Sequence, residues 1–347
     1  MNHELRIMNI LARGARKIFA GTAFCRQAEF KKILLATSAL ILFVLLASVP
    51  KANAQNFSVG AFPPVIQVDA KPPSNIRVPI TIQNYSDKTI TLKINFKQFR
   101  SSEKGNGEVV YPAKNDPSYE FLFSKLQVRE GDVKRGQIIL SPKQKKNFTF
   151  QALIPRDFEP KDYYFSILFA SEVNDPRDKT QSAAAGGIAT NVLLSLGEKK
   201  SPNGKISEFS APFFVTSGPI PFSVKVQNDN SYFITTEGNV IIKNIFGQPI
   251  GKLDLIPTNI LTQTSRFIPN NEGLREFFDS PKALWNENFL LGVYTAEASI
   301  SLSDQGPILK KKTTFIAVPI EIIAGFLIAI FILTVIYKRV KRKIESD

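Results

Sequence analysis

Few side chains in this sequence are able to carry out acid–base or nucleophilic catalysis. The only histidine is His3 and the only cysteine is Cys25, both near the N-terminus. The rest of the chain therefore lacks the parts of a Ser-His-Asp triad, a cysteine nucleophile, or a zinc site with His or Cys ligands. No Gly-x-Ser-x-Gly pattern or glycine-rich phosphate loop is present, and no sequence context singles out a Ser-Lys dyad.

A pair of carboxylates is the remaining route to catalysis, since two such groups can cleave a glycosidic bond. Glu172 and Asp175 are the candidate pair, but they lie in a charged segment whose composition favours a solvated loop. Side-chain oxygens also occur together at residues 174–178 and 228–230, without the spacing or closing Glu of an EF-hand. Turn chemistry explains both clusters, so we predict no metal, no other cofactor and no enzymatic activity.

Basic residues are the best candidates for ligand binding. They are concentrated in the first half of the region between residues 55 and 314. A cationic surface outside a cell attracts anionic wall polymers or lipid headgroups, while a solvated sheet face is the alternative interpretation. The candidate ligand contacts are Lys134, Arg135, Lys143, Lys145 and Lys146.

Two apolar segments predict the topology. Residues 33–49 follow Lys31 and Lys32 and precede an Ala-Asn-Ala sequence ending at Ala54, as in a secretory signal peptide with an extended basic region over residues 1–54. Residues 315–337 are predicted to be a transmembrane helix, and the basic tail, residues 338–347, predicts a cytoplasmic end. We therefore expect a single-pass cell-membrane protein with residues 55–314 outside.

The topology also accounts for the basic composition. The formal net charge is +14, and more than half of it lies in residues 1–54 and 315–347. The charge is therefore poor evidence for nucleic-acid binding, and we expect no nucleic-acid partner. Within the apolar segment, Pro319 suits the first turn of a helix and Glu321 suits its positive end. Glu321 is a candidate contact for a membrane partner if it is buried in the bilayer instead.

Period-2 alternation of apolar and polar residues dominates the region outside the membrane. Residues 76–83, 90–97 and 147–151 alternate in this way, as half-buried antiparallel strands do. The sequence predicts an all-β fold with two immunoglobulin-like, pilus-chaperone-like β-sandwich domains, at residues 55–200 and 201–314. An echo supports two related domains, because the Gln-Asn pair and later Ile-Thr pair of residues 80–91 recur at residues 224–235.

The first domain carries two long polar inserts, residues 101–118 and 171–187. Their Gly, Asn, Ser and charged residues are typical of exposed loops. Such loops on a rigid sandwich are where binding surfaces often form. We interpret both inserts as mobile surface loops.

The order of these parts resembles the WxL-interacting proteins of bacterial cell surfaces. The resemblance rests on short patterns at residues 78–84, 91–96, 140–142, 154–157 and 163–169, and at residues 218–221, 244–247 and 292–295. Lys161 and Asp162 depart from the family pattern, which has a Gly before the Tyr strand. The resemblance implies a peptidoglycan-binding sandwich, a second sandwich for host or partner proteins, one membrane span and a short basic tail.

These observations favour a non-enzymatic adaptor that contacts cell-wall material, either peptidoglycan or an anionic glycan, or surface proteins. Two other hypotheses remain open at this stage. The chain is either a structural subunit of an envelope membrane complex or, with less support, a wall hydrolase built on carboxylates.

Overall fold

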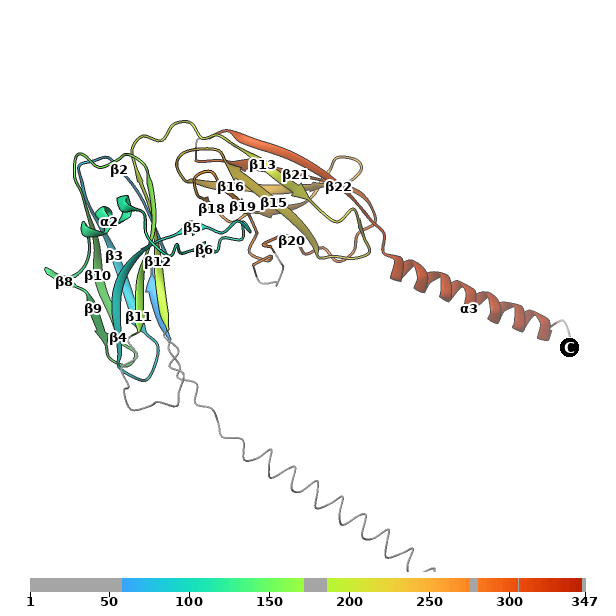
Figure 1. Cartoon of the computed structure of the whole chain (residues 1–347). Coiled ribbons are helices and arrows are strands. Elements are labelled where there is room, and N and C mark those ends of the chain that lie inside the picture. Colours follow the sequence, from blue (N-terminus) through green and yellow to red (C-terminus); the bar gives the residue numbers. More distant parts are fainter. Residues whose placement is uncertain (1–57, 172–185, 275–279, 305, 345–347) are drawn as a thin grey trace, which may run out of the picture. The chain divides into compact units, whose positions relative to one another are not determined.

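A computed structural model describes residues 58–171, 186–274, 280–304 and 306–344 of the chain (Figure 1). The predicted signal peptide, the carboxylates Glu172 and Asp175, and nearly all of the insert at residues 171–187 lie outside the described residues. The part that is described is mainly β-structure. The predicted all-β fold with two immunoglobulin-like sandwiches and an apolar C-terminal helix is confirmed.

The first sandwich is built from two five-stranded sheets in the described part of the chain. One has the order β1-β3-β10-β7-β8, and the other has the order β2-β12-β11-β4-β9. Strand β2 pairs with β12 in parallel, and the other neighbours are antiparallel. The strands are β1 (Val59–Phe62), β2 (Val65–Ala70), β3 (Ser74–Asn84), β4 (Ile90–Gln98), β7 (Leu126–Glu130), β8 (Val133–Arg135), β9 (Gln137–Leu140), β10 (Lys145–Ile154), β11 (Asp162–Ser171) and β12 (Gly187–Leu196).

The second sandwich follows after residues 197–203. One sheet has the order β13-β15-β19, with β20 also on β15, and the other has the order β14-β22-β21-β16-β17, with β18 also on β16. The strands are β13 (Gly204–Ser210), β14 (Phe214–Val215), β15 (Ile220–Asn228), β16 (Ile234–Lys243), β17 (Pro249–Asp254), β18 (Thr258–Ile260), β19 (Ser265–Phe267), β20 (Ala283–Trp285), β21 (Gly292–Ser301) and β22 (Ile308–Ala317).

Each sandwich has its own apolar core between its sheets. Phe150 of β10 packs against Phe165 of β11 in the first core, with ring centroids 6.1 Å apart. Trp285 packs edge-on against Phe315 of β22 in the second core. The alternation that predicted half-buried strands is visible in β3, where Ile76, Ile80 and Ile82 are buried.

The echo in the sequence corresponds to a repeated structural device. Asn84 ends β3 and Asn228 ends β15, and both side chains are fully buried. The Asn84 amide donates to the carbonyls of Lys88, Leu140 and Ser141, at 2.7, 3.4 and 2.9 Å. The Asn228 amide donates in the same way to the carbonyls of Tyr232, Ile260 and Leu261, at 2.8, 3.0 and 3.1 Å. Each asparagine therefore joins the end of its strand to two neighbouring segments.

The insert at residues 101–118 is ordered, so its interpretation as a mobile loop was wrong. It contains β6 (Val109–Val110), which pairs with β5 (Arg100–Ser101), and the start of helix α2 (Pro117–Ser124). Helix α2 buries Tyr119 and Leu122. The polar composition hid this structure because only two residues of the helix are buried.

The predicted apolar span began at residue 315, which was wrong for the helix, whereas a helix start near Pro319, as its position in a first turn indicated, is confirmed. Phe315 and Ala317 are buried residues of β22, and Ile316 pairs with Val293 of β21. Helix α3 runs from Ile320 to Ile344, directly after Pro319. The apolar residues of β22 and α3 are continuous in sequence, which is why hydropathy alone merged the end of a core strand with the helix.

Candidate binding surfaces

The five predicted basic contacts lie around one end of the sheet β1-β3-β10-β7-β8, but not on a single face. In β10, Lys145 pairs with Gln83 and Lys146 pairs with Ile82. Because successive side chains of a strand point to opposite faces, Lys145 lies on the outer face and Lys146 on the side of the core. The predicted group therefore divides into two sets.

The set on the core side is already paired with an acid. Arg135 and Lys146 both contact Glu130, at 3.0 and 3.4 Å. Lys143 also has partners, since its ammonium lies 3.0 Å from a carboxylate oxygen of Asp87 and 2.7 Å from the carbonyl of Tyr85. These three cations are therefore less available to an anionic ligand than the sequence suggested.

Lys134 and Lys145 lie on the outer face with different neighbours. Strand pairing puts Lys134 beside Arg129, Arg129 beside Thr149, and Gln151 beside Arg77. Since β10 residues two apart share a face, the cations Arg77, Arg129, Lys134 and Lys145 all project from the outer face. Among the described residues, neither Lys134 nor Lys145 forms an ion pair.

Amide side chains fill the space between these cations. Gln127 donates to Gln151 at 2.9 Å, and Gln151 donates to Asn75 at 2.8 Å, which forms a ladder across three strands. Asn147 accepts a hydrogen bond from Thr81 at 2.9 Å. We call this surface the amide face; it comprises the exposed or half-buried residues Asn75, Arg77, Gln127, Arg129, Lys134, Lys145 and Asn147, together with Gln151, which links Gln127 to Asn75 and is itself buried.

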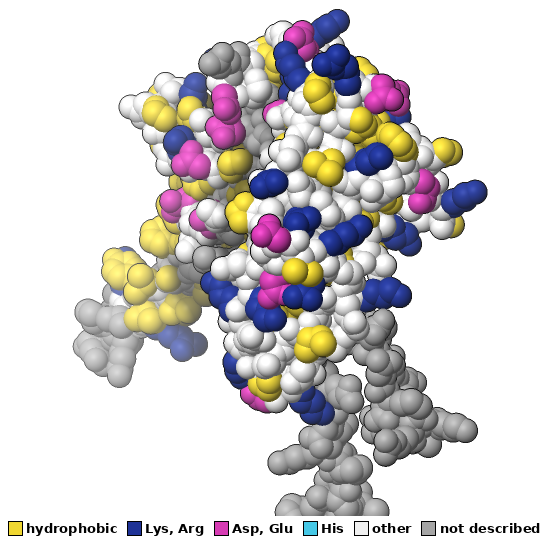
Figure 2. All heavy atoms as spheres, turned by 90° about the vertical axis from the view of Figure 1, so that its left-hand side faces the viewer, with side chains coloured by type: hydrophobic (Ala, Val, Ile, Leu, Met, Phe, Trp, Pro, Cys, Tyr) yellow, Lys and Arg dark blue, Asp and Glu magenta, His cyan; other side chains and the backbone are white. Residues whose placement is uncertain are grey.

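The amide face combines fixed hydrogen-bonding groups with positive charge. No carboxylate occupies an outward position on the described strands β1, β3, β10, β7 and β8, because Glu130 lies on the core side with Val128. On the side of the molecule that Figure 2 shows, Lys and Arg side chains are spread over the surface with a smaller number of acids between them. The amide face can therefore bind hydroxyl-rich or anionic chains by hydrogen bonds and screened attraction.

Glu321 lies in the first turn of α3 and is exposed. An acid at this position is favoured by the positive end of the helix dipole. None of the described residues of the sandwiches covers it. Its role as a contact for a membrane partner stays a prediction.

A third feature, which sequence reasoning missed, joins the two sandwiches. Phe99, Tyr164 and Leu193 of the first sandwich form a buried apolar cluster with Phe233 of the second. Asp162 lies beside this cluster and accepts hydrogen bonds from Tyr164 at 2.7 Å, from Ser195 at 2.6 Å and from the Phe233 backbone at 2.5 Å. Burial raises the pKa of the Tyr164 phenol above its ordinary value, and the nearby Asp162 raises it further.

The hairpin of β5 and β6 makes a second connection. The backbone amide of Phe267 in β19 donates to the carbonyl of Gly105 at 2.8 Å. Gly107 also lies against Arg266, so closely that a Cβ atom there would overlap with the guanidinium group. The ordered insert is thus an arm from the first sandwich to the second.

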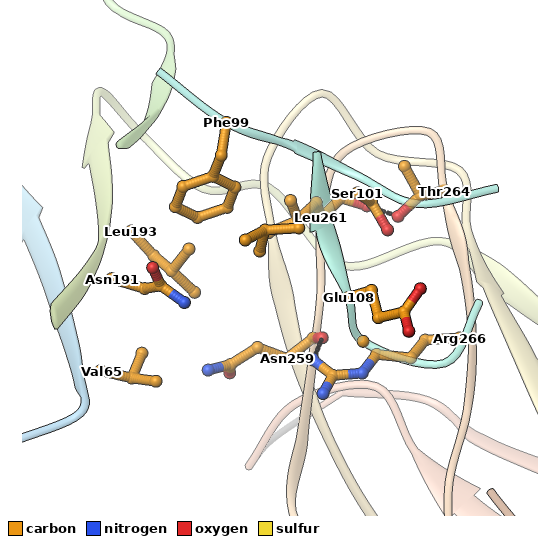
Figure 3. Close-up of a pocket in the computed structure, with 12 residues that line it drawn as sticks. Val65, Phe99, Ser101, Glu108, Asn191, Leu193, Asn259, Leu261, Thr264 and Arg266 are labelled. Atoms are coloured by element: carbon orange, nitrogen blue, oxygen red, sulfur yellow. Dashed lines mark hydrogen bonds between the residues drawn. The ribbon is translucent and has the colours of Figure 1, made fainter. Parts of the chain in front are cut away.

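A cavity of about 110 Å³ lies between these connections. Figure 3 shows Val65, Asn191 and Leu193 on one side of it and Asn259 and Arg266 on the other. The Arg266 guanidinium donates to the carbonyl of Asn259 at 2.9 Å, and burial lowers the pKa of Arg266 from its ordinary value. This cavity has room for a few water molecules or a small ion, so it is better suited to solvating the junction than to binding a polymer.

A signal for the junction was present in the sequence. In β11 three large aromatic residues, Tyr163, Tyr164 and Phe165, follow one another, so the sequence breaks the alternation expected of a half-exposed strand. All three are buried, as is Ile167. A strand that is apolar on both faces is covered on both faces. Tyr163 and Phe165 face the first core, while Tyr164 faces the second sandwich.

No family model matches the chain, and no curated protein does so either. Among solved structures, the chain is similar to the class 5 fimbriae chaperone CfaA, with 15% identity, 76% of this chain and 100% of that chain covered, and a TM-score of 0.36. It is also similar to the E. coli chaperone DraB, with 12% identity, 76% and 97% coverage and a TM-score of 0.33. The Pseudomonas aeruginosa CupB2 chaperone shows 10% identity, 73% and 96% coverage and a TM-score of 0.32. At these values the comparisons assign neither an activity nor a ligand to this chain.

Proposed function

We propose that this chain is a membrane-anchored, non-enzymatic binding protein of a bacterial cell surface. The observation that carries the proposal is helix α3. Its segment Ile320–Arg339 has 20 residues. An 18-residue window within it has a mean hydropathy of 2.6, and none of that window is buried against the rest of the described protein. At about 1.5 Å per residue this segment is about 30 Å long, which equals the thickness of a bilayer core.

The charges at the ends of α3 give the orientation of the proposed anchor. Lys338 and Arg339 end this segment, Lys341 and Arg342 follow it, and such residues favour the cytoplasmic side. Glu321 lies at the other end, at the level of the outer headgroups. In this orientation both sandwiches stand outside the membrane.

The amide face supplies the proposed ligand site. A sheet face with hydrogen-bonded amides, and with Lys134 and Lys145 free of ion pairs among the described residues, suits a long, hydroxyl-rich or anionic wall polymer that crosses several strands at once. This assignment replaces the original group of five contacts by its two outward members, Lys134 and Lys145, with Arg77 and Arg129 beside them. The order of parts that resembles the WxL-interacting proteins supports the same proposal, with the second sandwich available to surface proteins.

Sedimentation with purified wall material tests the ligand proposal. The full chain in lipid nanodiscs is mixed with insoluble cell wall at increasing salt, and the bound fraction is measured. We expect binding that weakens with salt, because the attraction between exposed charges is screened within about 10 Å at 0.1 M salt.

Two pairs of substitutions distinguish binding at the amide face from attraction by the positive charge of the protein as a whole. Lys134→Gln with Lys145→Gln removes two outward cations and is expected to weaken binding several-fold. Lys205→Gln with Lys310→Gln removes two exposed cations of the second sandwich and is expected to leave it unchanged. Equal losses in both pairs, or no salt-sensitive binding at all, would contradict the proposal.

A further inference from the structure

Large apolar side chains are exposed at one end of the second sandwich. Six of them, which we call the rim, are each at least 47% exposed: Phe213, Phe214, Ile245, Phe246, Phe289 and Leu291. Exposed aromatic and aliphatic groups gathered at one place on a protein mark an interaction surface. The rim is therefore a feature that the core of the sandwich does not explain.

Strand pairing places the rim at the end from which α3 leaves. Ala317, the last residue of β22, pairs with Gly292 of β21, directly after Leu291. On the other side of β22, the backbone amide of Ile316 donates to the carbonyl of Phe213 at 2.8 Å. Phe213, Phe214 and Leu291, with Phe289 two residues earlier in the chain, therefore lie at the end of β22 that precedes α3.

Ile245 and Phe246 belong to the same end of the sheet. They lie in the turn between β16 and β17, and Lys243 at its start is in register with Thr295 of β21. Beyond Lys243 the chain continues in the direction that leads along β21 from Thr295 toward Gly292, so the turn lies at the end of the sheet that holds Gly292 and Ala317. Since β16 and β22 both neighbour β21, the turn lies about 10 Å to the side of β22.

The turn that carries Phe246 holds a fixed conformation. The side-chain oxygen of Asn244 accepts hydrogen bonds from the backbone amides of Phe246 and Gln248, both at 3.0 Å, and Gly247 has a positive φ of 79°. These bonds need neither apolar side chain, yet Phe246 is 84% exposed at the tip. The turn thus holds Ile245 and Phe246 away from the sandwich.

The link to α3 is too short to move the rim far from the helix. Only Val318 and Pro319 separate β22 from Ile320, and the amide of Val318 donates to the carbonyl of Val215 at 2.9 Å. Three residue steps span at most about 11 Å. If α3 crosses a bilayer, the rim lies within reach of its outer headgroups.

We propose that the rim inserts into the outer interface of the bilayer and seats the second sandwich on the membrane. Aromatic and aliphatic side chains at the level of the headgroups bind there by burying apolar surface. The proposal rests on the membrane anchor proposed above. Its consequence is that the anchor does not act as a free tether: the sheet end and α3 form one continuous membrane-binding element.

The opposite end of the same sheet provides the contrast. There β22, β21 and β17 begin or end at Ile308, Ser301 and Asp254, and β16 begins at Ile234, which is buried, so Ile308 is the exposed large apolar residue among these strand ends. Ile308 is 64% exposed, similar to the rim residues, but it lies nine residues before Ala317 along β22. This separation is about 30 Å, so Ile308 is a matched control for exposure without proximity to the membrane.

Depth measurements in lipid test the proposal on the full chain. Single cysteines are introduced as Phe246→Cys, Ile308→Cys and Ile328→Cys in a Cys25→Ser background and labelled with a fluorophore. The proteins are placed in phosphatidylcholine and phosphatidylglycerol vesicles that contain lipids with a nitroxide just below the headgroup. We expect the labels at 246 and 328 to lose most of their fluorescence and the label at 308 to keep it.

The label at residue 328 distinguishes failure of the rim from failure of the anchor. Quenching at 328 without quenching at 246 leaves the anchor in place and overturns the rim proposal. No quenching at 328 refutes the anchor itself. Quenching at 246 that depends on a second labelled copy, and not on the lipid nitroxide, shows that the rim is a protein interface and also overturns the proposal.

Discussion

Truncation of the buried asparagine that ends β3 gives a quantitative test of how the sandwiches are held together. Asn84→Ala removes three donated hydrogen bonds and the two that Asn84 accepts from Ser86, at 2.9 and 2.7 Å. A buried polar group left without a partner costs about 1–3 kcal/mol. The buried backbone N–H of Ser86 loses Asn84 as its acceptor, while the carbonyls of Lys88 and Ser141 keep bonds from Ser86 and Gln144. With the net loss of about 0.5–1.5 kcal/mol for each of the other bonds, we expect a total loss of about 3 kcal/mol.

A loss of this size is measurable by thermal unfolding of the full chain in detergent. It corresponds to a fall in Tm of roughly 6–12 °C for a domain of this size. Asn228→Ala removes the equivalent contacts of the second sandwich, and we expect a loss of the same order. Asn147→Ala is the matched control because Asn147 is exposed and has a single bond to Thr81; we expect less than about 0.5 kcal/mol.

The substitution Asn84→Asp sharpens the test. The carboxylate keeps the oxygen that faces Ser86 but cannot donate to the three carbonyls, so it should be at least as destabilising as alanine. If Asn84→Ala and Asn147→Ala unfold at the same temperature, the hydrogen bonds of Asn84 do not stabilise the end of β3. The role that we give to the buried asparagine would then be wrong.

Three further predictions concern the junction and its surroundings. The two carboxylate oxygens of Asp162 accept three hydrogen bonds, and Asp162→Asn replaces one of these oxygens by an amide nitrogen that cannot accept. Hydrogen exchange at the Phe233 amide should therefore become faster, and unchanged exchange would contradict the role of Asp162 in joining the two sandwiches. Gly107→Ala should raise protease cleavage of the arm more than Gly131→Ala, because both have positive φ but only Gly107 contacts another side chain; equal cleavage would refute the contact. Burial raises the pKa of Tyr119 to about 12, so the contribution of its neutral phenol to stability is complete below the ordinary phenol pKa and is lost as the pH rises through 12. Ultraviolet titration should show that Tyr119→Phe removes one phenol that ionises near pH 12. Loss of a phenol that ionises at the ordinary pH would contradict this.

Much of the fold was predictable because strand periodicity records which face is buried. The alternation at residues 76–83 predicted β3, and the repeated Gln-Asn pair predicted two related sandwiches. The function of the pair was not predictable, because two of the three carbonyls that the Asn84 amide contacts lie more than fifty residues away. Long-range partners of this kind leave no local pattern.

The candidate surface was only partly predictable for a related reason. Lys145 and Lys146 are neighbours in sequence but point to opposite faces, and Glu130, which neutralises Lys146, lies on another strand. Counting charges along the chain therefore overestimated the cationic patch. The rim was invisible for the opposite reason, since Phe213, Phe246 and Leu291 come together only when the strands pair.

The central claim is that α3 crosses the membrane with both sandwiches outside, and labelling in intact cells tests it most directly. Lys310→Cys and Ser346→Cys are made separately in a Cys25→Ser background and treated with a maleimide that cannot cross membranes. A spanning α3 with the sandwiches outside predicts that the cysteine at 310 reacts in intact cells and that the cysteine at 346 reacts only after the membrane is opened. Reaction of both cysteines from outside, or of the one at 346 alone, would show that α3 does not cross the membrane in this orientation.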